Sequence, residues 1–532
     1  MSKSEPSAVA IGRDEPVVAT EYGRVRGVAT AGISSFKGIP YAAAPTGALR
    51  WRTPQPPEAW DGELDASRFG AIAPQPGLTW APKPGPAGRN TLPPTSEDCL
   101  TVNVFTPALG AAGLPVMVWI HGGAYYIGSS ADPLFDGSGL ALRGNVVVVT
   151  FNYRIGALGY LDFSAFADAS EPFESNIGQR DQLAALAWVQ RNISAFGGDP
   201  AKVTVFGESA GAGAITTLMA TPSAEGLFRG AIAESSPVGS IYSPERAHRS
   251  ASRFLQFLDL PRREIDRLRI LPVDTLTDAC KQLVMSSPSM DPGTIAVAPV
   301  VDGELVPEYP LTAFEAGRVL PVPLIIGTNR KEALFFKLLR SPLLPTTVAD
   351  IEAMVANLDV DKAWMIPPAY DGYPSRATAL AISTDAAFRM PAIWAATAHS
   401  RHAPTWLYEF DYVRPLLKAI GVGAMHGAEL PYVWGNPLGS PLAAVPLGGA
   451  RAAADVASRM QERWLSFAHT LDPNPPVSPS AASAGAPGRL PNWPHYDAAQ
   501  RNTLVIDKVD KIVPDPRRKR RQAWGDEIIS FQ

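Results

Sequence analysis

A serine lies at the centre of the glycine-flanked segment 207–211, whose sequence is Gly-Glu-Ser-Ala-Gly. The segment follows the apolar run 203–206 and precedes a stretch of small residues that ends at Met219, which predicts a strand, a sharp turn and a helix. Ser209 on such a turn could attack a carbonyl carbon, and the flanking glycines would let strand and helix approach closely around it. Taken alone, the pentapeptide is equally compatible with a plain glycine-rich turn.

A second glycine-rich segment, His-Gly-Gly-Ala at 121–124, follows the apolar run 115–120, which reads as a buried strand. Attack on an ester carbonyl creates a tetrahedral oxyanion, and each backbone N–H group aimed at that oxygen stabilises the transition state by about 3 kcal/mol. We expect the N–H groups of Gly123, Ala124 and Ala210 to form such an oxyanion hole. The alternative for 121–124 is a simple turn at the end of a strand.

Further segments with distinctive sequences are 36–42, 49–51, 96–104, 176–200, 299–303 and 429–435. Together with the two glycine-rich motifs, they resemble the carboxylesterase and cholinesterase family, the type-B carboxylesterases of the α/β-hydrolase superfamily. The resemblance extends from about residue 17 to the end of the chain. It implies an α/β fold, with a large and mostly parallel central sheet, helices on both faces and inserted helical cap segments. Ala124 after the two glycines is similar to the bacterial p-nitrobenzyl esterase branch.

A serine nucleophile needs a histidine to take its proton and a carboxylate to orient that histidine. In α/β-hydrolases both partners follow the serine in the chain. We expect the histidine to be His426, because it lies in a glycine-rich loop where the resemblance places the catalytic imidazole; the alternative is an exposed structural histidine. Four other histidines lie in helix-like polar or mixed surroundings and are expected at the surface, namely His248, His399, His402 and His469.

The predicted acid is Glu332, which follows the apolar strand candidate 322–326. Active sites of open α/β sheets form beyond the carboxyl ends of the strands. The family usually has an acidic residue before this glutamate and glycine after it, whereas this chain has Lys331 and Ala333. Glu332 could therefore instead be a surface residue paired with Lys331 or Arg330. The remaining alternative acids are Asp302 and Glu304, although the Asp-Gly of the family is structural at that place.

Three further acidic or hydroxyl side chains have open roles. Glu208 precedes the serine and would either tune the electrostatics of the pocket or stabilise the turn through buried hydrogen bonds. Ser235 resembles a family serine close to the catalytic groups, so we expect it to act at most through another residue. Arg50 and Glu97 lie in family segments that commonly pair with each other, and we expect a structural ion pair.

These residues predict a serine ester hydrolase that acts on small or medium carboxylic esters through an acyl-enzyme intermediate. No cofactor or metal is expected, because the chain contains no H-E-x-x-H, C-x-x-C or G-x-x-x-x-G-K motif. Two alternatives use the same fold: a non-catalytic binding protein, or a lipase that prefers long-chain esters. Specificity like that of acetylcholinesterase is disfavoured, because Trp80 does not fall at the spacing of the family's choline site.

The chain is long enough to bury a large core, with 532 residues of which 46% are hydrophobic. We expect a loosely attached or disordered tail over residues 1–16 and a single catalytic domain over 17–532. Strand-like runs such as 146–151 alternate with helical patterns such as 179–192, which favours a mostly parallel sheet with helices on both faces. The start of the domain, 17–32, is expected to be an antiparallel hairpin.

Helical patterns return near residues 237–297 and 342–390, and we expect these segments to be insertions that cap the active site. The stretches 74–94 and 472–491 are rich in proline, alanine and serine and predict loops. The basic run 517–521 stands alone and is expected to be one solvated face of a C-terminal helix.

Charge and cysteine content bound the partners and the compartment. The net charge of −4 gives no reason to expect a nucleic-acid partner, and no run of 18 apolar residues suggests a membrane span. The first residues lack the layout of a signal peptide. The chain has two cysteines, Cys99 and Cys280, and the family's partner for Cys99 is missing upstream, so we expect two reduced thiols and a cytoplasmic enzyme. The sequence leaves the oligomeric state, monomer or dimer, open.

Overall fold

The computed structural model describes residues 15–77, 92–110, 113–166, 172–290, 295–356, 363–435, 447–476 and 490–526. Most of the expected N-terminal tail, 1–14, lies outside the described residues. So do Trp80 and the greater part of the two expected loops, 78–91 and 477–489.

The described chain begins with a small sheet. Its strands are β1 (Val17–Thr20), β2 (Gly23–Arg26) and β5 (Glu63–Asp65), with β2 in the middle. β1 and β2 pair antiparallel, as the sequence predicted for the start of the domain, and β2 and β5 pair parallel.

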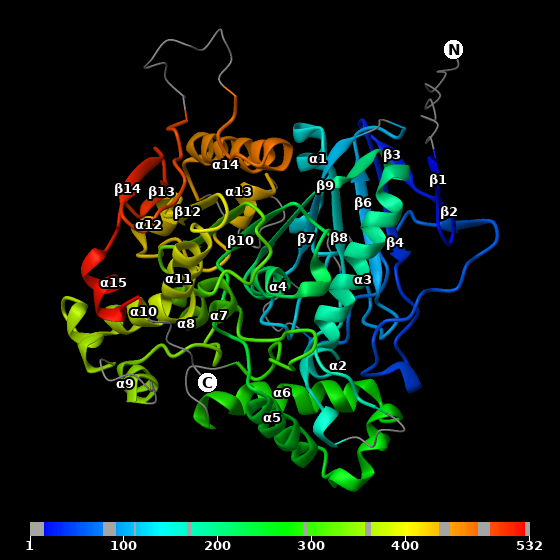
Figure 1. Ribbon diagram of the computed structural model, residues 1–532, viewed down its shortest axis with the longest axis horizontal. Helices are drawn as coiled ribbons and strands as arrows, with labels where there is room; N and C mark the ends of the chain where they lie inside the picture. Colours follow the sequence, from blue (N-terminus) through cyan, green and yellow to red (C-terminus); the bar gives the residue numbers. More distant parts are fainter. Residues whose placement is uncertain are drawn as a thin grey trace, which may run out of the picture.

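A second, larger sheet forms the centre of the molecule (Figure 1). In spatial order its strands are β14 (Lys511–Pro514), β13 (Asn502–Ile506), β12 (Thr405–Phe410), β11 (Leu324–Asn329), β10 (Gly230–Glu234), β9 (Gly198–Glu208), β7 (Leu114–Ile120), β8 (Val147–Phe151), β6 (Thr101–Thr106), β4 (Ile33–Pro40) and β3 (Val28–Thr30). Neighbours from β13 through β8 pair parallel, and the strands outside them pair antiparallel. The sheet is therefore mostly parallel, which confirms the predicted α/β class.

Alternate residues of the central strands pack into two separate hydrophobic clusters, one on each face of the sheet. On β7, Val116 and Val118 pack on the side of α3 (Ile177–Asn192) and α4 (Ala210–Met219). Met117 and Trp119 face the other way, toward α1 (Ser138–Gly144) and α14 (Ala450–Thr470). Because both faces are covered, the central strands are apolar at nearly every position rather than at every second one.

The remaining helices lie beyond the ends of the strands or on a face of the sheet. They are α2 (Gly156–Tyr160), α5 (Pro244–Phe257), α6 (Val273–Met290), α7 (Pro310–Glu315), α8 (Ala333–Leu338), α9 (Val348–Ala356), α10 (Arg376–Thr384), α11 (Met390–His399), α12 (Pro415–Ala419), α13 (Leu430–Val433) and α15 (Arg518–Trp524). Figure 1 shows α5 and α6 lying together beyond one end of the sheet. A π-helical turn, Asp385–Arg389, joins α10 to α11. No helix among the described residues has the length and apolar character needed to cross a bilayer.

The basic run at 517–521 is not simply a solvated helix face, as the sequence suggested. Arg521 is buried and bonds Asp515 with two of its nitrogens, at 2.8 and 2.9 Å. Arg517 is partly buried and pairs with Glu409 of β12. Only Arg518 and Lys519 of this run are exposed. Asp515 lies close to Arg521 in the chain, whereas Glu409 lies on a distant strand, so the pairing of Arg517 could not be inferred from the run itself.

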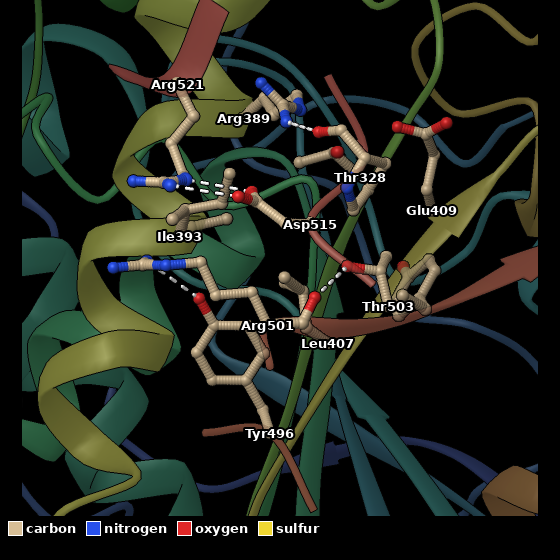
Figure 2. Close-up of a pocket in the computed structure, with 13 residues that line it drawn as sticks. Thr328, Arg389, Ile393, Leu407, Glu409, Tyr496, Arg501, Thr503, Asp515 and Arg521 are labelled. Carbon is tan, nitrogen blue, oxygen red and sulfur yellow. Dashed lines mark hydrogen bonds and ion pairs between the residues drawn. The ribbon is translucent and has the colours of Figure 1, made fainter. Parts of the chain in front are cut away.

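Arg521 also lines a small hollow between α11 and the C-terminal strands (Figure 2). Arg389, Arg501 and Asp515 line it as well. The predicted catalytic residues Ser209, Glu332 and His426 do not line it. The hollow is thus separate from the candidate active site.

Candidate active site

Ser209 occupies a strained turn between the end of β9 and the start of α4. Its backbone angles are φ 56° and ψ −124°, which L-residues rarely adopt. A Cβ on Gly207 would lie 2.6 Å from the carbonyl oxygen of Ile120, and one on Gly211 would lie 2.0 Å from the same oxygen. Both glycines are therefore required, because the end of β7 touches the turn on both sides of the serine.

The structure brings the three predicted side chains together. His426 Nε2 lies 2.8 Å from Ser209 Oγ, and His426 Nδ1 lies 2.7 Å from Glu332 Oε2. Glu332 is fully buried, while Ser209 and His426 are 9% and 8% exposed. The alternative of a surface Glu332 is therefore wrong.

The carboxylate of Glu332 is held on its far side as well. Its Oε1 accepts hydrogen bonds of 2.6 Å from the Ser235 hydroxyl and of 2.6 Å from the backbone N–H of Asn329. Arg330, one of the two surface partners considered for Glu332, pairs instead with Glu409 and Asp411. Glu332 keeps its contacts with His426 and Ser235 although Lys331 and Ala333 flank it in the chain.

Glu208 approaches the histidine from the side of the serine. Its Oε1 lies 3.2 Å from His426 Nε2, the nitrogen that also contacts Ser209 Oγ. Burial raises the pKa of Glu208 to about 7. Burial lowers the pKa of His426, but the carboxylates of Glu208 and Glu332 outweigh it and raise that pKa to about 9. A protonated imidazole is therefore stabilised here by two carboxylates.

Two further buried glutamates escaped the sequence reasoning. Glu429 is fully buried and accepts a hydrogen bond from the Asn329 side chain, and burial, Glu208 and Glu332 raise its pKa to about 8. Glu234 is fully buried at the end of β10, where Trp464 Nε1 donates to it at 2.7 Å. Burial raises the pKa of Glu234 well above its ordinary value. A glutamate directly after an apolar strand was the available signal for Glu234.

The loop after β7 packs directly against the serine. A Cβ on Gly122 would lie 3.0 Å from Ser209 Cβ, and one on Gly123 would lie 2.0 Å from the carbonyl oxygen of Ile127. Gly123, Ala124 and Tyr125 follow one another with φ of 111°, 54° and 57°. Ala210 is the first residue of α4, so its N–H is one of those a helix leaves without an internal partner.

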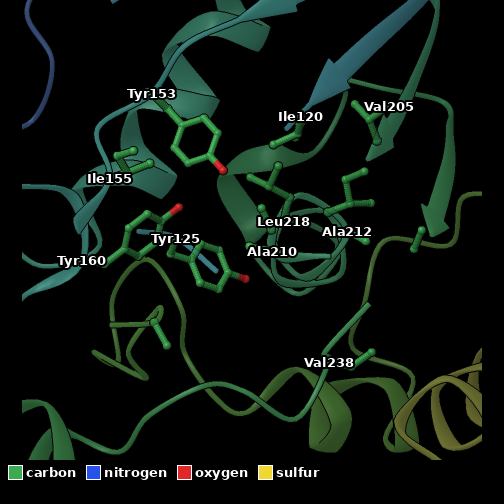
Figure 3. Packing of buried hydrophobic residues seen from close by; sticks show 14 of the residues in the cluster. Ile120, Tyr125, Tyr153, Ile155, Tyr160, Val205, Ala210, Ala212, Leu218 and Val238 are labelled. Carbon is green, nitrogen blue, oxygen red and sulfur yellow. The ribbon is translucent and has the colours of Figure 1, made fainter. Parts of the chain in front are cut away.

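Aromatic rings support this loop from behind (Figure 3). The His121 ring stacks on Tyr153 at 4.4 Å, and the Tyr153 hydroxyl donates to the His121 carbonyl at 2.7 Å. Burial lowers the pKa of His121 to about 4, so this ring is neutral. Tyr125 packs against Tyr160 at 4.6 Å. The left-handed backbone of the loop is thus fixed by buried neighbours.

The alternative acids have other partners. Asp302 accepts hydrogen bonds from the Ser175 hydroxyl at 2.5 Å and from the Asn176 side chain at 2.7 Å. Glu304 is exposed and lies 3.7 Å from Arg180. The carboxylates that contact His426 are instead those of Glu332 and Glu208.

Two other sequence expectations can be compared with the structure. Arg50 and Glu97 pair through two hydrogen bonds of 2.6 and 2.7 Å, and Cys99 and Cys280 are both free and buried. The expectation for His399 is wrong, because this residue is fully buried and its Nε2 lies 2.8 Å from the Val322 carbonyl oxygen. Its mixed sequence surroundings hid a helix that packs against the sheet.

Comparisons with known proteins identify the family of the chain. The model of the carboxylesterase family matches residues 14–524. The chain is 38% identical to para-nitrobenzyl esterase from Bacillus subtilis (strain 168), over 95% of this chain and 98% of that protein. It is 36% identical to fumonisin B1 esterase from Sphingopyxis macrogoltabida, over 86% of this chain and 83% of that protein.

Solved structures are similar over the same length. A structure of PNB esterase aligns with a TM-score of 0.84 at 37% identity, and the alignment covers 96% of this chain and 99% of that one. The chain therefore belongs to the carboxylesterase family, has the α/β-hydrolase fold and is a hydrolase of carboxylic ester bonds.

Proposed function

We propose that this protein is a serine carboxylesterase with Ser209 as nucleophile, His426 as general base and acid, and Glu332 as the orienting carboxylate. The observation that carries the proposal is the continuous pair of contacts, 2.8 Å from Ser209 Oγ to His426 Nε2 and 2.7 Å from His426 Nδ1 to Glu332. This order of groups is what proton transfer from a serine hydroxyl requires.

The reaction proceeds in two halves. His426 Nε2 takes the proton of Ser209 as Oγ attacks the ester carbonyl, and it then gives this proton to the leaving alcohol. Water, deprotonated by the same nitrogen, releases the acid from the acyl-enzyme. Glu332 holds Nδ1–H and stabilises the imidazolium that forms in each half.

The N–H groups of Gly123, Ala124 and Ala210 are proposed as the oxyanion hole. Support comes from the contact of the 121–124 loop with Ser209 and from the position of Ala210 at the start of α4. The donors would be fixed before substrate arrives, because the loop has positive φ at Gly123 and Ala124 and is anchored by the buried His121 and Tyr125 on either side.

Small or medium esters are the proposed substrates. The serine and histidine are nearly buried, and the rings of Phe335 and Phe336 lie 5.9 and 5.1 Å from the imidazole. Relatives named para-nitrobenzyl esterase and fumonisin B1 esterase support ester hydrolysis without fixing the alcohol.

We further propose a single catalytic domain from residue 17 onward, with the helical segments near 237–297 and 342–390 as caps over the site. The described parts of these segments include α5, α6, α9 and α10. A bacterial, cytoplasmic enzyme is proposed on the two free buried thiols and on the similarity to a bacterial esterase.

The test is hydrolysis of p-nitrophenyl esters from acetate to palmitate by the wild type and by Ser209→Ala. We expect short-chain activity that falls at least about a thousandfold in the variant. A long-chain preference would favour a lipase. Absence of activity on every ester, or equal activity in both proteins, would contradict the proposed reaction or its nucleophile.

A further inference from the structure

The π-helical turn between α10 and α11 lies next to the candidate active site. The N–H of Met390 donates to the carbonyl of Asp385, five residues earlier, where an α-helix would bond four residues earlier. Such turns are rare and are frequently found at functional sites, because the extra residue changes which side chains share a face. Here it follows directly on α10 and leads directly into α11.

Phe388, near the end of this turn, packs against the imidazole of His426. The two ring centroids are 4.7 Å apart with an angle of 35° between the planes. Phe336 of α8 lies 5.1 Å from the same imidazole and stacks on Phe388 at 6.2 Å. Phe388 is 3% exposed and Phe336 is 7% exposed. The nitrogens of the imidazole thus contact Ser209, Glu332 and Glu208, while Phe388 and Phe336 pack beside the ring.

The turn that carries Phe388 is itself anchored. Asp385 accepts a hydrogen bond of 2.6 Å from the hydroxyl of Tyr370. Arg389 donates to the carbonyl of Pro516 and lines the hollow of Figure 2, so adjacent residues of the turn reach two different regions. Just before the turn, Thr384 Oγ1 accepts a hydrogen bond of 3.1 Å from Ala333 N–H. The turn is therefore connected to the residue after Glu332 as well as to the histidine.

We propose that Phe388 is a positioning residue for His426, set in place by the π-helical turn; this rests on the proposed serine esterase function. The imidazole must keep Nε2 on Ser209 and Nδ1 on Glu332 in both proton transfers, and hydrogen bonds alone leave the ring free to tilt. The buried phenyl ring restricts that tilt. It also keeps water from the imidazole, whose pKa burial lowers.

A small displacement of a reacting group costs a large factor in rate, about a hundredfold for 1 Å. We therefore expect Phe388→Leu to lower kcat for p-nitrophenyl acetate about tenfold, and Phe388→Ala to lower it further, with KM nearly unchanged. Burial lowers the pKa of His426, so water that reaches the imidazole in these variants should raise this pKa. Because the neutral imidazole is the base, the acidic limb of the kcat profile should then move to higher pH.

The experiment measures kcat and KM across a pH range that extends well above the pKa of His426 of about 9, together with thermal unfolding, for these two variants, the wild type and Phe105→Leu. Phe105 is a fully buried phenylalanine on β6 that packs in the hydrophobic cluster with Leu140 and Val148, away from His426. The control should lose thermal stability and keep the wild-type kcat and acidic limb. The low-field proton resonance of the His426–Glu332 hydrogen bond gives a second readout without substrate, which should shift in the Phe388 variants alone.

Three results would overturn the proposal. The first is a loss of thermal stability in Phe388→Leu with unchanged kcat, acidic limb and low-field resonance. The second is a rise in KM alone, which would assign Phe388 to substrate binding. The third is the same loss of kcat in Phe105→Leu as in Phe388→Leu. Failure of the proposed esterase function would be seen separately, as ester hydrolysis by Ser209→Ala at the rate of the wild type.

Discussion

Around Ser209 the chain is held by close backbone contacts, whereas around His426 it is held by hydrogen-bonded side chains. Gly207 and Gly211 leave no room for a Cβ beside the Ile120 carbonyl, and the serine has left-handed φ. Glu332, by contrast, accepts hydrogen bonds from one backbone N–H and from the hydroxyl of Ser235, although Ser235 also has a positive φ of 52°. The serine therefore depends mainly on close backbone packing, and the acid that orients the histidine depends mainly on hydrogen bonds and charge.

This difference predicts that the two halves fail in different ways. Changes of volume near the serine should lower stability and activity together. Changes of charge near the histidine should lower activity while the fold stays nearly as stable, provided that the replacement keeps its shape and hydrogen bonds.

The largest expected effect is that of Glu332→Gln. The amide keeps the shape but loses the charge that stabilises the imidazolium and fixes the tautomer, so kcat/KM for p-nitrophenyl acetate should fall about 10⁴-fold. Glu304→Gln is the matched control, because Glu304 is the exposed alternative acid and should leave kcat/KM unchanged. Comparable rates for Glu332→Gln and wild type would remove Glu332 from the mechanism.

Gly211→Ala should act through volume. Its Cβ would lie 2.0 Å from the Ile120 carbonyl, so strand β7 or helix α4 must shift. We expect the free energy of unfolding to fall by about 3 kcal/mol and kcat/KM to fall about a hundredfold. Gly139→Ala in α1, where a Cβ meets nothing within 4 Å, should keep activity and stabilise slightly. Chemical denaturation measures the stability of both variants, and ester hydrolysis measures their activity. Full stability of Gly211→Ala with lost activity would contradict the view that the serine turn depends on close packing.

Ser235→Ala should lower kcat/KM about tenfold, because a hydrogen bond to a buried carboxylate is lost. The Ser235 hydroxyl donates to Glu332 at 2.6 Å. Ser236→Ala is the control, since this equally buried hydroxyl contacts Thr216 at 3.1 Å and not the acid. Steady-state kinetics of the two variants side by side decide the matter, and an equal loss in both would mean that Ser235 acts only on the fold.

The smallest expected effect on rate, at the optimum pH, is that of Glu208→Gln. The Glu208 carboxylate raises the pKa of His426, so its removal lets the imidazole lose its proton at lower pH. Since the neutral imidazole is the base, the acidic limb of the kcat/KM profile should move to lower pH by about one unit. A limb that stays in place or moves upward would show that Glu208 does not act on this histidine electrostatically.

Local sequence was sufficient to predict the parts of the site whose geometry is set within a few residues. The segments 121–124 and 207–211 need glycine at fixed positions, so their turns and their shared site could be predicted. Glu332 was harder, because its neighbours differ from the family pattern and its burial depends on Ser235 and Asn329. His399 was misjudged, since a mixed helical pattern does not reveal that the helix packs against the sheet.

The sequence by itself determined the strand, turn and helix around Ser209, the loop at 121–124 and the family, because glycine and apolar patterns act over a few residues. Only the tertiary structure decided that Glu208, Glu234, Glu332 and Glu429 are all buried near one another, and that a π-helical turn puts Phe388 on His426. The groups of this site come from strands and helices far apart in the chain; Ser209 and His426, for example, are 217 residues apart. Spacing along the chain does not determine how closely such groups approach, because tertiary packing sets that distance.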